Sequence, residues 1–151
     1  MRIVRVQVGG GAVYGVLEGD TVKEIRGSIY GGYQVTDKTH RLADVELLVP
    51  CEPTKLLAMA RNYQSHVRPA QTPTKPELFF KTVSALLPHE GTIVIPKEAG
   101  KADYEGELVA VIGKRAKNVS KEEALSYVLG YTCGNDVSVR EWQDNDTQWW
   151  R

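Results

Sequence analysis

The sequence predicts a mostly β protein with few helices, an α+β fold, and three observations support this. Short runs of alternating apolar and polar residues recur along the chain, which is the period of a strand with one buried face. Glycine-containing turns separate several of these runs. A complete helix-start signal occurs only once, late in the chain. At 151 residues, the chain has room for one domain and a small appendage.

The pattern of apolar residues over residues 1–50 predicts a small N-terminal β-rich domain. Three runs have the strand pattern: residues 3–8, 13–17 and 21–25. A glycine triplet follows the first run, and residues 45–50 lead out of the domain. Glu18 and Asp20 are interpreted as turn residues, because this part holds no catalytic constellation.

Residues 51–151 predict a second domain. Further strands are expected at residues 55–60 (buried), 79–81, 92–96 and within 103–113. Ser120 followed by Glu123 has the spacing of a capping box and predicts a helix over residues 121–129. Gly130 then suits the residue that ends such a helix.

Composition excludes some classes of function. Lys plus Arg and Asp plus Glu both number 19, so no net charge favours nucleic acid or an anionic membrane as a partner. No run reaches the roughly 18 apolar residues of a membrane-spanning helix. Cys51 and Cys133 are the only cysteines and are expected to be reduced, which fits a cytoplasmic protein.

Two carboxylates near the start of an apolar run are the first candidate site. Glu105 and Glu107 are two residues apart, so on a strand they point to the same face. Asp136 follows a second apolar stretch and offers a third oxygen ligand. Such an all-oxygen set suits Mg²⁺ or Mn²⁺ better than Zn²⁺. The simpler alternative is a solvated acidic strand end.

Five segments in order resemble the fumarylacetoacetate hydrolase family. They include an N-Y-x-x-H loop, an F-x-K-x-x-S-A segment, the acidic strand and an N-D-V-S segment followed by arginine. The segments are residues 60–66, 78–86, 103–113, 118–132 and 135–140. The resemblance runs from about residue 53 to the end, and the first 50 residues resemble the short N-terminal domain of many members.

The resemblance implies a mixed β-roll and an enzyme of 2-oxo acid chemistry, including aromatic catabolism. The implied substrate is a small 2-oxo or β-diketo acid, converted through an enolate bound to Mg²⁺ or Mn²⁺, with Ca²⁺ an alternative ion in crystals. The reactions of the family are decarboxylation, keto–enol isomerisation and C–C hydrolysis. A homodimer without nucleic-acid or membrane partners is expected.

The resemblance also assigns roles to residues. Glu105, Glu107 and Asp136 would be the metal ligands, and His66 and Lys81 the catalytic residues. The substrate-binding candidates are Arg61, Tyr63, Arg140 and Gln143. Each has a simpler alternative: His66 as a structural histidine, Lys81 as a surface lysine, and Arg140 paired locally with Glu141 or Asp144.

Two histidines and one proline complete the interpretation. His40 and His89 match no motif and are expected at the surface. Pro69 stands where hydrolases and decarboxylases of the family commonly carry a glutamate that pairs with the histidine. This departure favours decarboxylation or isomerisation over hydrolysis.

The family pattern continues beyond Arg151 with a lysine and closing strands. We therefore expect residues 51–151 to lack the C-terminal part of the catalytic domain, and the isolated span to fold poorly and be inactive. Trp149 and Trp150 would lack part of their core. The alternative function is a non-catalytic fragment or interaction module that retains part of the fold, which affinity for a divalent metal would distinguish from an enzyme.

Overall fold

The structure is a computed structural model that describes residues 1–67 and 72–148. Strands dominate it, and its one α-helix among these residues is α1, Arg140–Asn145, so the mostly β class is confirmed. The expectations for Pro69, Trp149 and Trp150 lie outside the described residues. Within the described part, no helix has the length and apolarity that crossing a bilayer requires.

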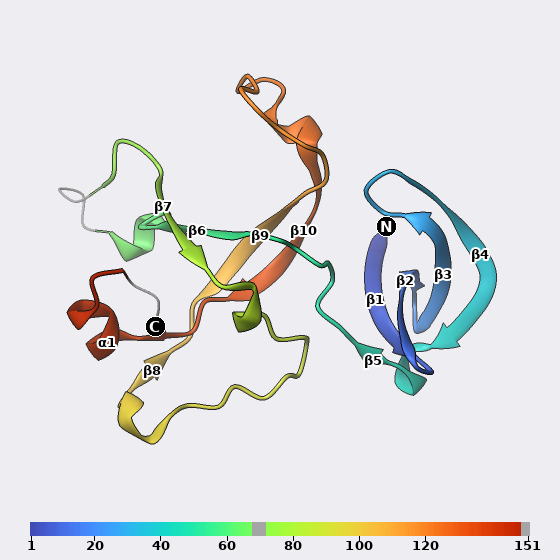
Figure 1. Cartoon of the computed structure of the whole chain (residues 1–151), viewed down its shortest axis with the longest axis horizontal. Helices are drawn as coiled ribbons and strands as arrows, with labels where there is room; N and C mark the ends of the chain where they lie inside the picture. Colours follow the sequence, from blue (N-terminus) through green and yellow to red (C-terminus); the bar gives the residue numbers. More distant parts are fainter. Residues whose placement is uncertain (68–71, 149–151) are drawn as a thin grey trace. The chain divides into compact units, whose positions relative to one another are not determined.

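The N-terminal residues form one antiparallel sheet of five strands in the order β4-β3-β2-β1-β5 (Figure 1). The strands are β1 (Arg2–Val8), β2 (Gly11–Glu18), β3 (Thr21–Ser28), β4 (Gly32–Arg41) and β5 (Glu46–Leu47). Val6 and Val22 are fully buried, as expected from the apolar phase of their strands. The three predicted strands are confirmed, whereas β4 was not predicted.

The described residues after β5 contain three two-stranded antiparallel ladders. The pairs are β6 (Leu56–Ala60) with β7 (Glu77–Lys81), β8 (Ala102–Asp103) with β11 (Ser138–Val139), and β9 (Gly106–Ile112) with β10 (Val128–Asn135). By contacts, the chain divides into two compact units, described separately here. One holds residues 1–52, 87–93 and 105–136, and the other holds 53–86, 94–104 and 137–151.

The helix predicted over residues 121–129 is wrong. Only a short 3-10 helix forms there, Ala124–Tyr127, and β10 begins at Val128. The Glu123 N–H does donate to the Ser120 hydroxyl, as a capping box requires. Pairing of Val128 with Ile112 of β9 then draws the chain into the ladder. Strand pairing therefore overrides the local helix signal, and Gly130 lies within β10 rather than after a helix.

Two other expectations need correction. Residues 92–96 are described and are not a strand, because no described strand pairs with them. The acidic run is not one continuous strand either. β8 pairs with β11 and β9 pairs with β10, so the chain changes partner at the two residues between them.

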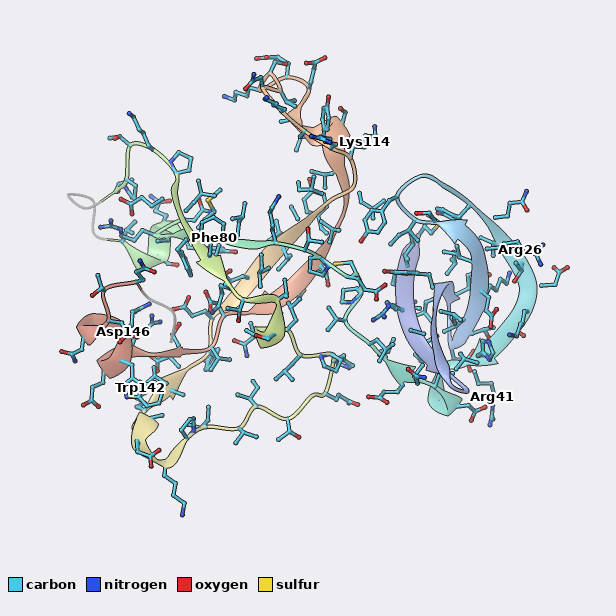
Figure 2. The ribbon with its side chains drawn as sticks, in the orientation of Figure 1. Arg26, Arg41, Phe80, Lys114, Trp142 and Asp146 are labelled. Atoms are coloured by element: carbon cyan, nitrogen blue, oxygen red, sulfur yellow. The ribbon has the colours of Figure 1, made fainter. Side chains whose placement is uncertain are left out.

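The two longer ladders each present an exposed apolar face. The strand at residues 55–60 was expected to be buried, but Leu57 and Met59 of β6 are both exposed. Phe80, which projects from β7 in Figure 2, is 65% exposed, and Leu108 of β9 is 69% exposed. Side chains on the opposite faces are half-buried, so the two faces alternate along each strand.

Candidate metal centre and active site

Three carboxylates gather where β9 begins and β10 ends. Glu105 immediately precedes β9, Glu107 is its second residue, and Asp136 immediately follows β10. One carboxylate oxygen from each side chain lies within 4.8 Å of the other two, and all three residues are half-buried. The predicted acidic residues are therefore neighbours in space, although Glu105 stands just outside the strand.

The backbone of the ladder produces this arrangement. The antiparallel register sets Glu107 opposite Gly134 and Gly106 opposite Asn135. Beyond that pair, the Asp136 N–H donates to the Glu105 carbonyl over 2.9 Å. The Asn135 side-chain oxygen accepts from the Glu105 N–H over 3.0 Å. The carboxylates at the neighbouring ends of β9 and β10 are thus held in one register. The sequence interpretation assigned no such role to Asn135 or Gly134.

The donor set is suited to a hard divalent cation. Two carboxylates about 4 Å apart repel by about 4 kcal/mol at an effective dielectric constant near 20. A divalent cation would convert this repulsion into attraction. All three donors are oxygens, the ligand type that Mg²⁺, Mn²⁺ and Ca²⁺ prefer over nitrogen or sulfur.

Arg140 and Gln143, two substrate-binding candidates, are brought together on α1. The Arg140 Nη1 donates to Gln143 Oε1 over 3.0 Å, and its Nε donates to Asp103 Oδ2 over 3.2 Å. The Asp103 carboxylate lies 37 residues away in sequence, so Arg140 has a distant partner besides the local ones that the sequence offers as an alternative. Pairing of β8 with β11 creates this contact, so no sequence spacing could have indicated it.

Asp103 forms ion pairs with two cationic side chains, Lys101 and Arg140. Lys101 Nζ lies 2.9 Å from Asp103 Oδ1, on the carboxylate that also accepts from Arg140. The hydrogen bonds from Lys101 and then Arg140 hold the pKa of Asp103 below its usual range. Asp103 therefore keeps its negative charge and anchors the Arg140 guanidinium at the start of α1.

The remaining candidates lie on and after the β6–β7 ladder. Arg61 follows β6 with a left-handed φ of 53°, and its Nε donates to Glu77 Oε2 over 2.8 Å. Tyr63 is partly exposed just before a 3-10 turn at Gln64–His66, which ends at the candidate base His66. Lys81 is the last residue of β7, half-buried and opposite Leu56.

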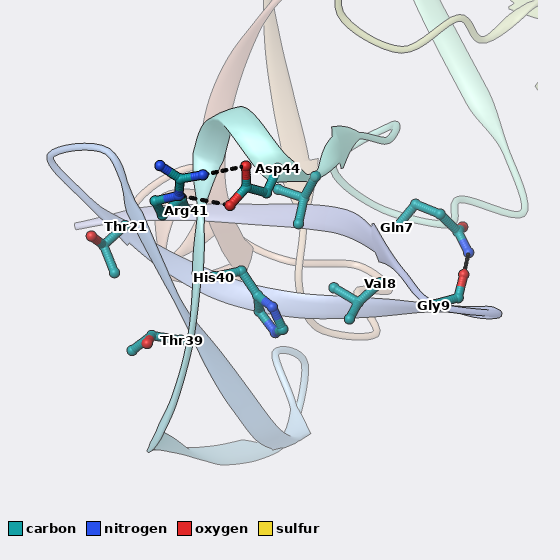
Figure 3. Close-up of a pocket in the computed structure, with 9 residues that line it drawn as sticks. Gln7, Val8, Gly9, Thr21, Thr39, His40, Arg41 and Asp44 are labelled. Carbon is teal, nitrogen blue, oxygen red and sulfur yellow. Dashed lines mark hydrogen bonds and ion pairs between the residues drawn. The ribbon is translucent and has the colours of Figure 1, made fainter.

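An open depression of about 420 Å³ lies in the N-terminal sheet, away from the predicted constellation in sequence (Figure 3). Polar residues line much of it, but the charged ones pair with one another. Arg41 donates from Nε and Nη2 to the Asp44 carboxylate over 2.7 and 2.8 Å. The described lining offers no group of metal ligands, so the carboxylate cluster is the stronger candidate.

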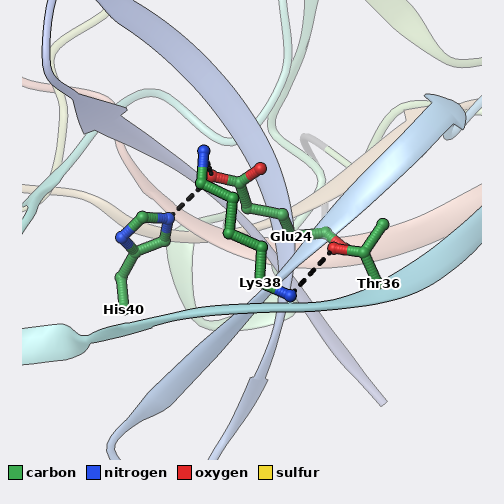
Figure 4. A network of polar contacts seen from close by, with 4 residues as sticks. All are labelled: Glu24, Thr36, Lys38 and His40. Atoms are coloured by element: carbon green, nitrogen blue, oxygen red, sulfur yellow. Dashed lines mark hydrogen bonds and ion pairs between the residues drawn. The ribbon is translucent and has the colours of Figure 1, made fainter.

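His40, which also lines the depression, is not the surface residue that the sequence predicts. Its side chain is 17% exposed, and its Nε2 lies 2.7 Å from Glu24 Oε1 (Figure 4). Lys38 Nζ lies 2.9 Å from the same oxygen. His89 is exposed, as expected.

Comparison with known proteins agrees with the fold. Residues 55–151 match the family described as "Fumarylacetoacetate (FAA) hydrolase C-terminal", and residues 1–50 match "Rv2993c-like, N-terminal". The mostly β fold and the cluster of three carboxylates define a class of α+β protein with a candidate metal centre. Within that class, the chain belongs to the fumarylacetoacetate hydrolase family.

Three relatives illustrate the range of the family. A caffeoylpyruvate hydrolase of Neonothopanus nambi is 45% identical, over 69% of this chain and 39% of its own. A mitochondrial oxaloacetate tautomerase of Xenopus laevis is 38% identical, over 71% of this chain and 35% of its own. The crystal structure of a 5-carboxymethyl-2-hydroxymuconate delta-isomerase from Mycobacterium smegmatis matches all of this chain and 60% of its own, with 37% identity and a TM-score of 0.85. The chain therefore spans about 35 to 60% of the length of these relatives.

Proposed function

We propose that this protein is a divalent-metal-dependent enzyme that acts on a 2-oxo acid or a β-diketo acid. The observation that carries the proposal is the cluster of Glu105, Glu107 and Asp136, with carboxylate oxygens within 4.8 Å of one another. Its place in the segment that matches the family supports a catalytic rather than a merely solvated cluster.

The cluster fits one small cation. Mg²⁺ binds oxygen at about 2.0–2.1 Å in an octahedron, which sets neighbouring ligand oxygens about 3 Å apart. Closing the observed spacing requires movements of about 1–2 Å, within reach of glutamate side chains that rotate about three torsions. Three carboxylates would leave three positions of an octahedron for substrate and water. We propose Mg²⁺ or Mn²⁺ as the ion.

When bound, the ion would polarise the substrate carbonyl as a Lewis acid. The proposed roles of the side chains follow from their chemistry. Arg140, held by Asp103 and beside Gln143, presents a planar guanidinium suited to a substrate carboxylate. Lys81, Arg61 and Tyr63 would bind and orient the substrate. His66 would move the proton at the carbon next to the carbonyl, since an imidazole titrates near neutral pH.

We propose keto–enol isomerisation or decarboxylation ahead of C–C hydrolysis. The reason is Pro69, which removes the carboxylate that would help a histidine to activate water. The relatives named as tautomerase and delta-isomerase support this order, while the relative named as hydrolase supports the alternative. A substrate panel with the full-length protein tests the order. Fast hydrolysis of an acylpyruvate with no turnover of oxaloacetate or an enol dioate would reverse it.

Metal binding is the direct test of the proposed function. Mg²⁺ and Mn²⁺ are titrated by calorimetry into the wild type, Glu107→Ala and the control Glu122→Ala, which removes an exposed glutamate. We expect the wild type and the control to bind one ion with similar affinity. Glu107→Ala should bind at least about 10-fold more weakly, because a ligand is lost. Equal binding by Glu107→Ala and the wild type would refute the ligand assignment.

The expected assembly and location also remain proposals. We propose a cytoplasmic homodimer with two domains, residues 1–50 and 51–151. Exposed apolar residues, such as Leu108 on β9 and Phe80 on β7, support coverage of each of these two ladder faces by protein. Light scattering of the full-length protein tests the dimer, which requires twice the mass of one chain.

A further inference from the structure

We propose that Asn135 is a positioning residue for the metal site, fixing Glu105 relative to Asp136 through the Glu105 backbone. This inference rests on the proposed function, because it concerns the same three carboxylates. The structural basis is a pair of hydrogen bonds that hold both backbone polar groups of Glu105, the N–H by the Asn135 side chain and the carbonyl by the Asp136 N–H.

The need for such a clamp follows from the position of Glu105. Glu107 lies within β9, where the ladder fixes its backbone opposite Gly134. Glu105 lies one residue before the strand, at the point where the chain leaves β8 and its partner β11. A backbone at such a change of partner has more freedom than one inside a ladder. Asp136 lies at the matching change of partner, between β10 and β11. Without an added restraint, Glu105 and Asp136 would be less fixed than Glu107.

Asn135 provides this restraint through chemistry that few side chains offer. As the last residue of β10, it stands opposite Gly106, and its amide oxygen accepts from the Glu105 N–H over 3.0 Å. An asparagine side chain commonly takes the place of a backbone acceptor where regular pairing ends. The next residue, Asp136, completes the clamp with its own N–H and also carries a ligand carboxylate. The hydrogen bond from the Glu105 N–H to the Asn135 side chain therefore helps to set the distance between Glu105 and Asp136.

The clamp predicts an effect on metal selectivity. Mg²⁺ demands a nearly ideal octahedron with short bonds, whereas Ca²⁺ accepts longer bonds and irregular geometry. Loosening Glu105 should therefore weaken Mg²⁺ binding more than Ca²⁺ binding. A role of Asn135 in general stability would instead lower the melting temperature of the metal-free protein and leave the ratio of the two affinities unchanged.

The test measures Mg²⁺ and Ca²⁺ binding by calorimetry, and metal-free thermal unfolding, in the full-length protein. Asn135→Ala removes the acceptor, while Asn135→Asp keeps an oxygen in its place. Asn145→Ala is the matched control, because Asn145 also makes a side-chain hydrogen bond to a backbone group, the Glu141 carbonyl in α1.

We expect Asn135→Ala to weaken Mg²⁺ binding about tenfold, the usual loss for a residue that orients a ligand, and Ca²⁺ binding by less. Asn135→Asp should restore the wild-type ratio of the two affinities, even where its added charge strengthens both. Asn145→Ala should change neither affinity. An unchanged Mg²⁺ to Ca²⁺ ratio in Asn135→Ala, with a wild type that binds Mg²⁺, would overturn the role of Asn135 alone. A wild type that binds neither ion would overturn the proposed function together with this inference.

Discussion

Arg140, proposed above to bind a substrate carboxylate, is held by one contact distant in sequence and one local contact. Its guanidinium donates to Asp103 and Gln143 at the same time, which fixes the plane of the fork. The low pKa of Asp103, caused first by Lys101 and then by Arg140, keeps this anchor ionised at neutral pH. An ammonium group could preserve the charge but not the fork.

Arg140→Lys should therefore raise KM for oxaloacetate about tenfold while kcat changes by less than about twofold. A higher KM with nearly unchanged kcat indicates the loss of an interaction that stabilises the bound substrate and the transition state equally. The tenfold estimate corresponds to about 1.4 kcal/mol, close to the lower end of the roughly 1.5–3 kcal/mol of a hydrogen bond to a charged group. The control Arg115→Lys, at an exposed arginine, should leave both constants unchanged. An unaltered KM in Arg140→Lys would show that Arg140 serves only to hold Asp103.

At the scale of the element, a half-buried acidic residue, Glu24, lies at the bulge between β3 and β4. The register shifts between Lys23 and Ile25, and Glu24 at the shift has a side chain that is only 15% exposed. Its carbonyl accepts from the Thr36 hydroxyl, and its carboxylate contacts Lys38 and His40 (Figure 4). Hydrogen bonds from Lys38 and then His40 lower the pKa of Glu24 from its ordinary value of 4.5.

The lowered pKa sets the direction of a pH effect. A carboxyl with a lower pKa in the folded state stabilises the fold at pH values above its unfolded pKa. That stabilisation is lost as the pH falls through the folded pKa. Glu24→Gln should therefore lower the melting temperature at pH 6, with the difference from the wild type shrinking below about pH 4.5.

Glu18→Gln is the control for this measurement. Glu18 pairs with Lys23 over 2.7 Å, but its side chain is well exposed, so its loss should have a smaller effect at every pH. Melting by circular dichroism from pH 3 to pH 7 makes the comparison. An equal or larger effect of Glu18→Gln, or a Glu24→Gln effect that is constant with pH, would contradict this account.

The β9–β10 ladder leaves no room for a side chain at Gly134, next to the carboxylate cluster. This residue lies opposite Glu107, and a Cβ there would stand 2.7 Å from Val109 Cγ2. Since valine has a stiff χ1, the strand itself would have to shift. We expect Gly134→Ala to destabilise the protein by about 1–3 kcal/mol, as overpacking does, and to weaken Mg²⁺ binding.

Gly130→Ala is a control on the same strand, because no atom lies within 4 Å of its added Cβ. It should leave Mg²⁺ binding unchanged and alter stability by less than about 1 kcal/mol. Urea unfolding and calorimetry measure both quantities. Equal effects of the two substitutions would exclude the contact with Val109 as the cause.

The same elements show what sequence reasoning can and cannot predict. Strands β1 to β3 follow from alternation, because one face of each lies against the core of the sheet. Strand β4 was missed because its residues are mostly polar and exposed, with little alternation to read. The helix over residues 121–129 failed because local signals carry no information about the pairing of Val128 with Ile112. The local spacing of Glu105 and Glu107 was enough to predict that their carboxylates lie close together. The hydrogen bond from Arg140 to Asp103 could not be predicted in this way, because it depends on the pairing of β8 with β11.

At the scale of the whole molecule, metal binding should be linked to global stability. An ion that binds only the folded state stabilises it by about 2.7 kcal/mol at 100 times its dissociation constant. For a chain of this size, that corresponds to an increase in melting temperature of about 5–10 °C. Trp142 lies in α1, so tryptophan fluorescence contains a signal from this helix. Adding Mg²⁺ should raise the melting temperature that this signal records, and a chelator should reverse the increase.

Glu107→Gln separates the effect of the ion from the effect of the carboxylates. The substitution keeps the size of the side chain and removes one of three negative charges whose oxygens lie within 4.8 Å of one another. Because mutual repulsion decreases, the metal-free variant should melt no lower than the metal-free wild type. The increase caused by Mg²⁺ should be largely lost, because one ligand is replaced by a neutral amide. A variant that melts lower without metal and still gains the full increase with Mg²⁺ would show that Glu107 supports the fold rather than binding the ion.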